Sequence, residues 1–279
     1  MSAVLDFDAK TADRPGTRWE IWAGGAVLTC AAILALATSW LASLHGQPID
    51  LDLRFVSPFS IAHPLGTDQL GRDLGMRILL GLRWSFATAL CATLIAFSIG
   101  ALLGLLAARS HSWLATTIRQ VTSLAQSFPV FVLAVSVIAL VGNGFVAISV
   151  VLGLVTWPVF CRVVQAETAS LSTREYVLAA GMLQMSTVRL YGMHILPGLV
   201  SSLSVLVPFH FADMLIAESA LSFLGVGASL GEATWGSMLQ ESRSYLWSAP
   251  WLMLLPAAAI VTLVIAANLL GDGLRRQLA

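Results

Sequence analysis

The chain has 279 residues, of which 57% are hydrophobic and only 11% are charged, and its formal net charge is zero. This composition, with a mean hydropathy of +0.84, is typical of integral membrane proteins and excludes a soluble globular domain. The charge is balanced, and no basic tract suggests a nucleic-acid partner.

The rarer residue types limit the chemistry of the chain. Lys10 is the only lysine and no glycine-rich turn precedes it, so there is no phosphate-binding loop; if ATP drives this protein, another chain binds the ATP. Cys30, Cys91 and Cys161 lie in apolar stretches without paired spacing, and we interpret them as small core residues. The five histidines are scattered. We therefore expect no metal site and no catalytic residue.

Stretches without Asp, Glu, Lys or Arg predict the membrane spans, because a spanning helix needs about 20 apolar residues. The first stretch, 21–44, is longer than the apolar part of a secretory signal and is followed by no convincing cleavage site, so we expect a retained helix. The stretch 84–108 predicts the second span. The stretch 120–161 is long enough for two spans, divided by the Gly-Asn-Gly turn signal at 142–144. Polar groups and a proline are expected to bend the third span, at Ser123, Gln126, Ser127 and Pro129.

Two further stretches complete the set. The stretch 190–212 contains the fifth span, which begins after Pro197, and 244–271 contains the sixth, which begins near Pro250. The sequence therefore predicts an all-α polytopic membrane protein with six transmembrane helices, of which the last five form a core at 84–271.

The segment 45–83, between the first two spans, contains the run HPLGTDQLGRD at 63–73. Glycines, a proline and hydrogen-bonding side chains in so short a run predict an ordered turn. In the simplest interpretation, Asp68, Arg72 and Asp73 bond the local backbone and one another on a surface loop.

Residues 174–197 are helix-prone and carry charges between two apolar stretches. They cannot span a bilayer, because Arg174, Glu175, Gln184 and Arg189 would have to be desolvated at a cost of several kcal/mol. The block must lie outside the hydrocarbon. A helix there, followed at once by another apolar run, would suit the docking of a soluble partner.

His210 and Asp213 are three positions apart near the end of the fifth span, so they are expected on one face, with Glu218 near the outer end of the helix. Ionisable groups inside a bilayer indicate a translocation path. A polar contact within or between subunits is the alternative, and Met214 beside them makes a transient metal contact conceivable. Pro208 is expected to break the helix nearby.

The second outer segment, 218–250, is too polar and glycine-rich to cross the membrane. In the simplest interpretation it packs as a lid on neighbouring helices, with Trp235, Tyr245 and Trp247 as interfacial anchors.

Basic residues predict the orientation. With the tail 1–20 inside, the inner segments carry ten Lys and Arg residues and the outer segments five. Because basic residues favour the cytoplasmic side, we expect both termini, including the tail 272–279, and the loop 162–197 in the cytoplasm.

Three separated motifs resemble those of ATP-binding-cassette importer permeases. The block 174–197 is similar to their cytoplasmic coupling loop, which reads roughly Glu-Tyr-Val-Glu-Ala-Ala, then Gly, then Ile-Leu-Pro; here Leu178 replaces the second Glu and Gln184 the Gly. The resemblance implies an ATPase-coupling role for Glu175, Tyr176, Ala179, Ala180, Gln184, Ile195, Leu196 and Pro197.

The run 63–73 resembles the signature found ahead of the permease core in the dipeptide, oligopeptide and nickel importer family. Residues 218–227, 235–236 and 268–275 are also similar to that family's pattern. The resemblance implies that residues 235–247 form the outer mouth against the substrate-delivering protein, a role that is compatible with a lid. The external motif implied by the resemblance consists of Gly66, Thr67, Asp68, Gly71, Arg72 and Asp73.

The resemblance implies the type I ABC importer permease fold in the bacterial cytoplasmic (inner) membrane. It also implies a second, homologous permease, two cytoplasmic ATPase subunits that bind ATP and Mg, and an external substrate-binding protein. Peptides are the expected cargo, with nickel or a metal chelate as the alternative. A secondary transporter would need broken helices in two related halves, and a membrane hydrolase would need a nucleophile beside His210 and Asp213.

Overall fold

The structure is a computed structural model that describes residues 17–45, 49–109, 113–183, 185–228 and 232–278. The described residues form helices and turns, with one isolated β-bridge between Thr67 and Asp73. Among the described residues, five helices are long and apolar enough to cross a membrane, and there are six candidates when a bent pair of helices is counted as one span. The predicted all-α polytopic fold is confirmed.

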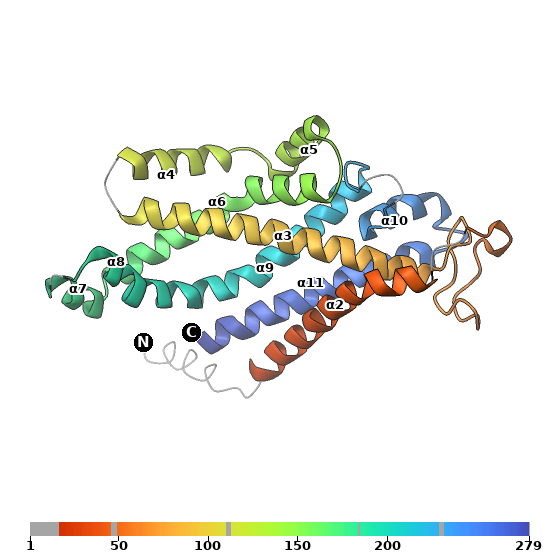
Figure 1. The fold of residues 1–279 in the computed structure, drawn as a ribbon, viewed down its shortest axis with the longest axis horizontal. Coiled ribbons are helices and arrows are strands. Elements are labelled where there is room, and N and C mark those ends of the chain that lie inside the picture. The colour runs from red at the N-terminus through yellow and green to blue at the C-terminus, as the bar shows by residue number, and fades with distance from the viewer. Residues whose placement is uncertain (1–16, 46–48, 110–112, 184, 229–231, 279) are drawn as a thin grey trace, which may run out of the picture.

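The long helices are α2 (Thr17–His45), α3 (Leu74–Arg109), α6 (Phe145–Ser172), α9 (Leu196–Phe223) and α11 (Trp251–Leu278), and the bent pair is α4 (Trp113–Ala125) with α5 (Val130–Val141). Shorter helices lie at the two ends of the bundle (Figure 1). They are η1 (Leu51–Leu53), α7 (Glu175–Met182), α8 (Thr187–Leu190), the π-helical turn η2 (Tyr191–Ile195), α10 (Trp235–Ser242) and η3 (Arg243–Tyr245).

The bend between α4 and α5 is 90°. Pro129 lies at the N-cap of α5, where the missing N–H of proline and the restriction on the preceding residue prevent a continuous helix. Gly142, with φ 100°, ends α5, and Gly144 precedes α6. The expected bend of the third span is confirmed, and so is the turn at 142–144.

Helix α3 begins at Leu74, well before the charge-free stretch at 84–108. The Asp73 carboxylate accepts a hydrogen bond from the N–H of Met76 at 2.9 Å and so caps the first turn. Arg77 is buried in this extension, where acidic side chains pair with it. A charge therefore lies in the helix without ending it.

Close approach of α3 and α6 forms the centre of the bundle. A Cβ added to Gly100 would lie 2.5 Å from the Cβ of Phe160, and one added to Gly153 would lie 2.6 Å from Ile95. Ala89 and Ala92 of α3 are fully buried. Small residues at such contacts let membrane helices pack closely.

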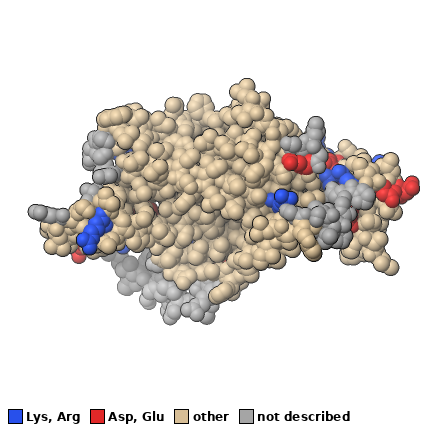
Figure 2. Space-filling view, viewed as in Figure 1, with Lys and Arg blue, Asp and Glu red and all other residues tan. Residues whose placement is uncertain are grey.

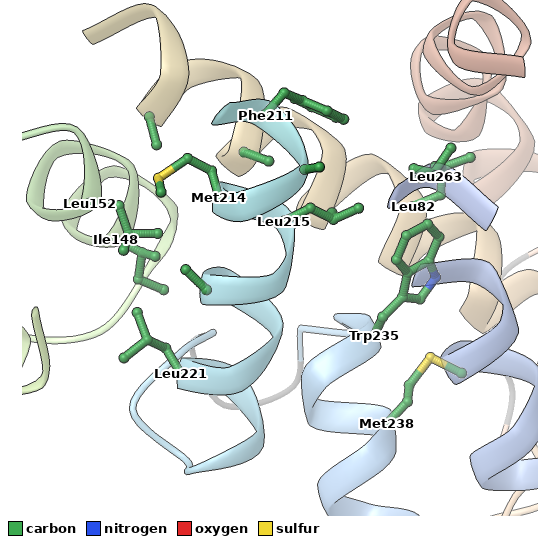
Figure 3. Close-up of a cluster of buried hydrophobic side chains, with 14 of the residues drawn as sticks. Leu82, Ile148, Leu152, Phe211, Met214, Leu215, Leu221, Trp235, Met238 and Leu263 are labelled. Carbon is green, nitrogen blue, oxygen red and sulfur yellow. The ribbon is translucent and has the colours of Figure 1, made fainter. Parts of the chain in front are cut away.

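Helix α9 runs without interruption through Pro208 to Phe223, so the expected break there is wrong. A membrane helix tolerates proline when neighbouring helices and side chains satisfy the freed backbone group. Figure 3 shows Met214 of α9 beside Ile148 and Leu152 of α6, Leu215 on the opposite side of α9, and Trp235 and Met238 of α10 beside α9.

Helix α2 packs on α11 at one face. A Cβ added to Gly24 would lie 2.4 Å from the carbonyl oxygen of Ala266, and Arg276 donates to Glu20 at 2.8 Å. The start of α2 and the end of α11 therefore lie together. Cys30 is exposed on α2, so it is not the core residue expected from the sequence, whereas Cys161 is buried as expected.

Candidate functional site

Charged side chains gather at the two ends of the molecule in the view of Figure 2, and the face between them is uncharged. One end carries α7 and α8, and the other carries the loop 49–73 and α10 (Figure 1). These two ends contain most of the residues singled out by the sequence.

The segment 175–197 presents an apolar surface at its end of the bundle. Met182 and Leu183 are each 80% exposed, Leu178 is 51% exposed and Tyr176 is 46% exposed. Ala179 lies on the same exposed side. We call these five residues the α7 surface. On a protein surface in water, an exposed apolar patch of this kind marks an interaction site.

The opposite side of α7 is anchored to the bundle. Val177 and Ala180 are buried, so Ala180 packs on this chain's own helices and only its neighbour Ala179 is available to a partner. Tyr176 stacks on the ring of His194 with the centroids 6.3 Å apart. Glu175 begins the helix, and Gln184 lies outside the described residues.

The C-terminal part of the segment joins the membrane span directly. Ile195 is buried, whereas Leu196 and Pro197 are exposed in the first turn of α9. The π-helical turn Tyr191–Ile195 connects α8 to α9, and the helical path from Val188 to Phe223 has no break. A displacement of the part that begins at Val188 would therefore be transmitted to α9.

At the other end, two glycines shape the loop 49–73. Gly66 and Gly71 have φ of 84° and 73°, in the left-handed region that favours glycine. A Cβ on Gly71 would lie 1.7 Å from the carbonyl oxygen of Asp50, so only glycine fits there. The Thr67 hydroxyl accepts from the N–H of Val56 at 2.9 Å and donates to the carbonyl of Leu53.

Asp68 is the fully buried centre of this loop. One carboxylate oxygen accepts from the N–H groups of Leu70 and Arg72, at 2.8 and 2.9 Å. The other accepts from the Arg72 and Arg77 guanidinium groups, both at 2.7 Å. The expected bonding of Asp68 with Arg72 and the local backbone is confirmed, but Asp73 pairs with His63, at 2.8 Å, and caps α3.

The loop is also tied to α10. Arg77 donates to both oxygens of Glu241, at 2.9 and 3.1 Å, and Gln69 donates to Glu241 at 2.8 Å. We call Asp68, Arg72, Arg77 and Glu241 the outer network. Sequence reasoning missed this link, for which the only signal was a charged residue, Arg77, close to an apolar stretch.

Burial by itself would raise the pKa of Glu241, but hydrogen bonding and charge from Arg77, with help from Gln69 and Arg72, outweigh it and hold the pKa below its usual value. Glu241 is therefore ionised at neutral pH. It joins two outer segments that are far apart in the sequence.

The three residues considered for a translocation path do not share one surface. His210 is 3% exposed, with its ring 4.7 Å from that of Phe160 and its Nδ1 3.4 Å from the Thr93 hydroxyl. Asp213, on the same helix, is exposed on the surface of the chain. Glu218 is fully buried and accepts from the Ser222 hydroxyl at 2.7 Å.

Known proteins are similar to this chain in sequence and in fold. The family model described as binding-protein-dependent transport system inner membrane component matches residues 100–279. The glutathione transport permease GsiD of Pectobacterium atrosepticum is 38% identical over 219 residues, which is 78% of this chain and 73% of that one. The nickel permease NikC of Escherichia coli K12 is 30% identical over 94% of both chains.

Two further matches extend the comparison. The dipeptide permease DppC of Alkalihalophilus pseudofirmus is 32% identical over 90% of this chain and 83% of its own length. In fold, the chain is similar to an inward-facing structure of the MetNI methionine ABC transporter, with a TM-score of 0.61 and 17% identity over 74% of this chain and 98% of that one.

Proposed function

This chain belongs to the family of binding-protein-dependent transport system inner membrane components and is a permease subunit of an ABC importer, and we propose that its cargo is a short peptide. In this proposal the chain forms half of the translocation pathway and a second, homologous permease forms the other half. Two cytoplasmic ATPase subunits bind and hydrolyse ATP with Mg, and an external binding protein delivers the cargo.

The observation that carries the coupling proposal is the α7 surface. Its exposed apolar side chains lie on α7 and at its C-terminal end, outside the candidate spans, and the chain that follows α7 is helical without a break from Val188 to the end of α9. Closure of the ATPases would move this segment as a lever and so shift α9 against its neighbours. Glu175, Tyr176 and Ala179 would contact the ATPase directly, whereas Ala180 would hold α7 on the bundle.

The proposed orientation places both termini and the α7 surface in the cytoplasm. The excess of basic residues on that side supports it. The ion pair of Glu20 with Arg276 joins the start of α2 to the end of α11, as termini on one side of the membrane require. The loop 49–73 and α10 would then face the binding protein.

Peptides are favoured as cargo because two of the relatives are named for glutathione, a tripeptide, and for dipeptides. Nickel is the second candidate, since the nickel permease matches over 94% of both chains. The two candidates are separated by the uptake assay below.

The experiment starts from the complex purified through a tag on this chain. We expect an ATPase subunit and a second permease to copurify, and vesicles containing the complex and its binding protein to take up labelled dipeptide only with ATP. Uptake of nickel ions instead would replace the peptide proposal with the alternative. Purification of the chain without an ATPase would contradict the coupling proposal.

A further inference from the structure

A cavity of about 470 Å³ lies where the outer end of α3 meets the start of α6 and residues 232–233. Its lining includes Arg83 and Trp84 of α3, Phe145 of α6, and Glu232. The volume falls within the range of small-molecule sites, roughly 300–1,000 Å³. The cavity is separate from the outer network and from the α7 surface.

The described lining of the cavity includes an acidic residue, Glu232, and a basic residue, Arg83, together with the aromatic side chains of Trp84 and Phe145. Glu232 is held in place by Trp84, whose indole N–H donates to its carboxylate at 2.9 Å. The rings of Trp84 and Phe145 meet edge to face with the centroids 6.0 Å apart. This contact fixes the orientation of the indole, and thereby of the carboxylate.

Arg83 differs from the neighbouring arginines of the same helix and loop. Arg72 and Arg77 both pair with carboxylates in the outer network, whereas Arg83 has no ion-pair partner in the part of the chain that the structure describes. It lines the cavity with its guanidinium exposed. A free guanidinium is suited to bind a carboxylate with two parallel hydrogen bonds.

We propose that this cavity binds the two free termini of a short peptide, with the ammonium group on Glu232 and the carboxylate on Arg83. Trp84 and Phe145 would contact an apolar side chain of the peptide, and Trp84 would also position Glu232. The inference rests on the proposed peptide cargo and assigns it a first site on this chain, at the outer end of the bundle.

The headgroup of phosphatidylethanolamine carries the same pair of charges, an ammonium group and an anion. The experiment therefore uses the whole complex in phosphatidylcholine nanodiscs, which offer no primary ammonium group, and without the binding protein. Equilibrium binding of labelled L-alanyl-L-alanine is measured, with its N-acetyl and C-amide forms as competitors, and is repeated with phosphatidylethanolamine added.

Each charge has its own expected result. Arg83→Gln should weaken binding of the free dipeptide roughly tenfold or more while leaving the C-amide form unaffected, and Arg83→Lys should restore part of the loss. Glu232→Gln keeps an acceptor for Trp84 and should weaken binding of the free dipeptide but not of the N-acetyl form. Arg54→Gln, in the outer loop, is the matched control and should leave binding unchanged.

The outcomes separate this inference from the proposed function. Dipeptide uptake with ATP, together with unchanged binding in the Arg83 and Glu232 variants, would overturn the cavity inference alone. Charge-dependent binding without uptake would support the cavity and contradict the peptide cargo. A third outcome is that phosphatidylethanolamine displaces the dipeptide and that the Arg83 and Glu232 variants change only the amount of bound lipid. This outcome would assign the cavity to lipid and overturn the inference.

Discussion

At the scale of single residues, the outer network explains how α3 carries a buried arginine, Arg77, in its first turn. Arg77 is 3% exposed and has two carboxylate partners, Asp68 and Glu241. Removing one partner from a buried ion pair leaves an uncompensated charge, which costs about 3–5 kcal/mol when no other partner remains. Because Glu241 stays, the cost at Asp68 should lie below that range.

The first prediction is that Asp68→Asn lowers the melting temperature of the purified complex and loosens the loop 49–73. Asn retains one acceptor for the backbone but loses the charge that faces Arg72 and Arg77. Thermal unfolding in detergent is the measurement. Asp52→Asn, at an exposed position in the same loop, is the control and should leave the melting temperature unchanged. Equal melting temperatures for wild type and Asp68→Asn would contradict this role.

The second prediction concerns pH. The pKa of Glu241 is lower in the folded protein than its ordinary value of 4.5, so its ionised form contributes stability above that pH. The contribution is lost as the pH falls through the lower folded value. We expect Glu241→Gln to be less stable than wild type at pH 7, and this difference to shrink only as the pH falls below 4.5 and through the folded value. A difference that stays constant from pH 7 to well below 4.5 would be the contrary result.

At the scale of helices, α7 illustrates why spacing alone does not identify the exposed side. Ala179 and Ala180 are neighbours in a motif, yet one is exposed and the other is buried. His210 and Asp213 differ in the same way, although three positions on a helix lie close to one face. In both cases the exposure of a residue depends on which side of its helix packs against neighbouring helices. The sequence of a single helix does not contain that information.

The third prediction is that Ala179→Glu abolishes ATP-dependent uptake while the protein remains folded in the membrane. The new carboxylate would be placed in an apolar interface with the ATPase, but would not be buried in this chain. Ala179→Ser, which keeps a small side chain, is the control. Ala180→Glu should instead destabilise the chain, because Ala180 is buried among its own residues. Normal uptake by the Ala179→Glu protein would show that α7 does not dock.

At the scale of the whole molecule, the spans could be predicted because hydrocarbon excludes charge over lengths of about 20 residues. Helix α3 begins at Leu74, ahead of the predicted span, because Arg77 is neutralised by partners that a local window does not include. The bond between Gln69 and Glu241 joins positions far apart in the sequence, and no local pattern predicts it. The cavity beside Arg83 likewise depends on three separate segments.

The fourth prediction tests the orientation. In a background without cysteine, Phe59→Cys and Trp247→Cys, at positions 95% and 96% exposed, should react with an impermeant thiol reagent in intact cells. Arg174→Cys, at an exposed position outside the α7 surface, should react only after permeabilisation. Labelling of Arg174→Cys from outside would reverse the proposed orientation.

The most direct test of the coupling role is to place a photo-crosslinking amino acid at Met182 of the α7 surface and to irradiate native membranes. We predict a covalent adduct with the ATPase subunit, which the same amino acid at Phe59 should not form. No ATPase adduct from Met182, or an ATPase adduct from Phe59, would contradict the claim that the α7 surface couples this permease to ATP hydrolysis.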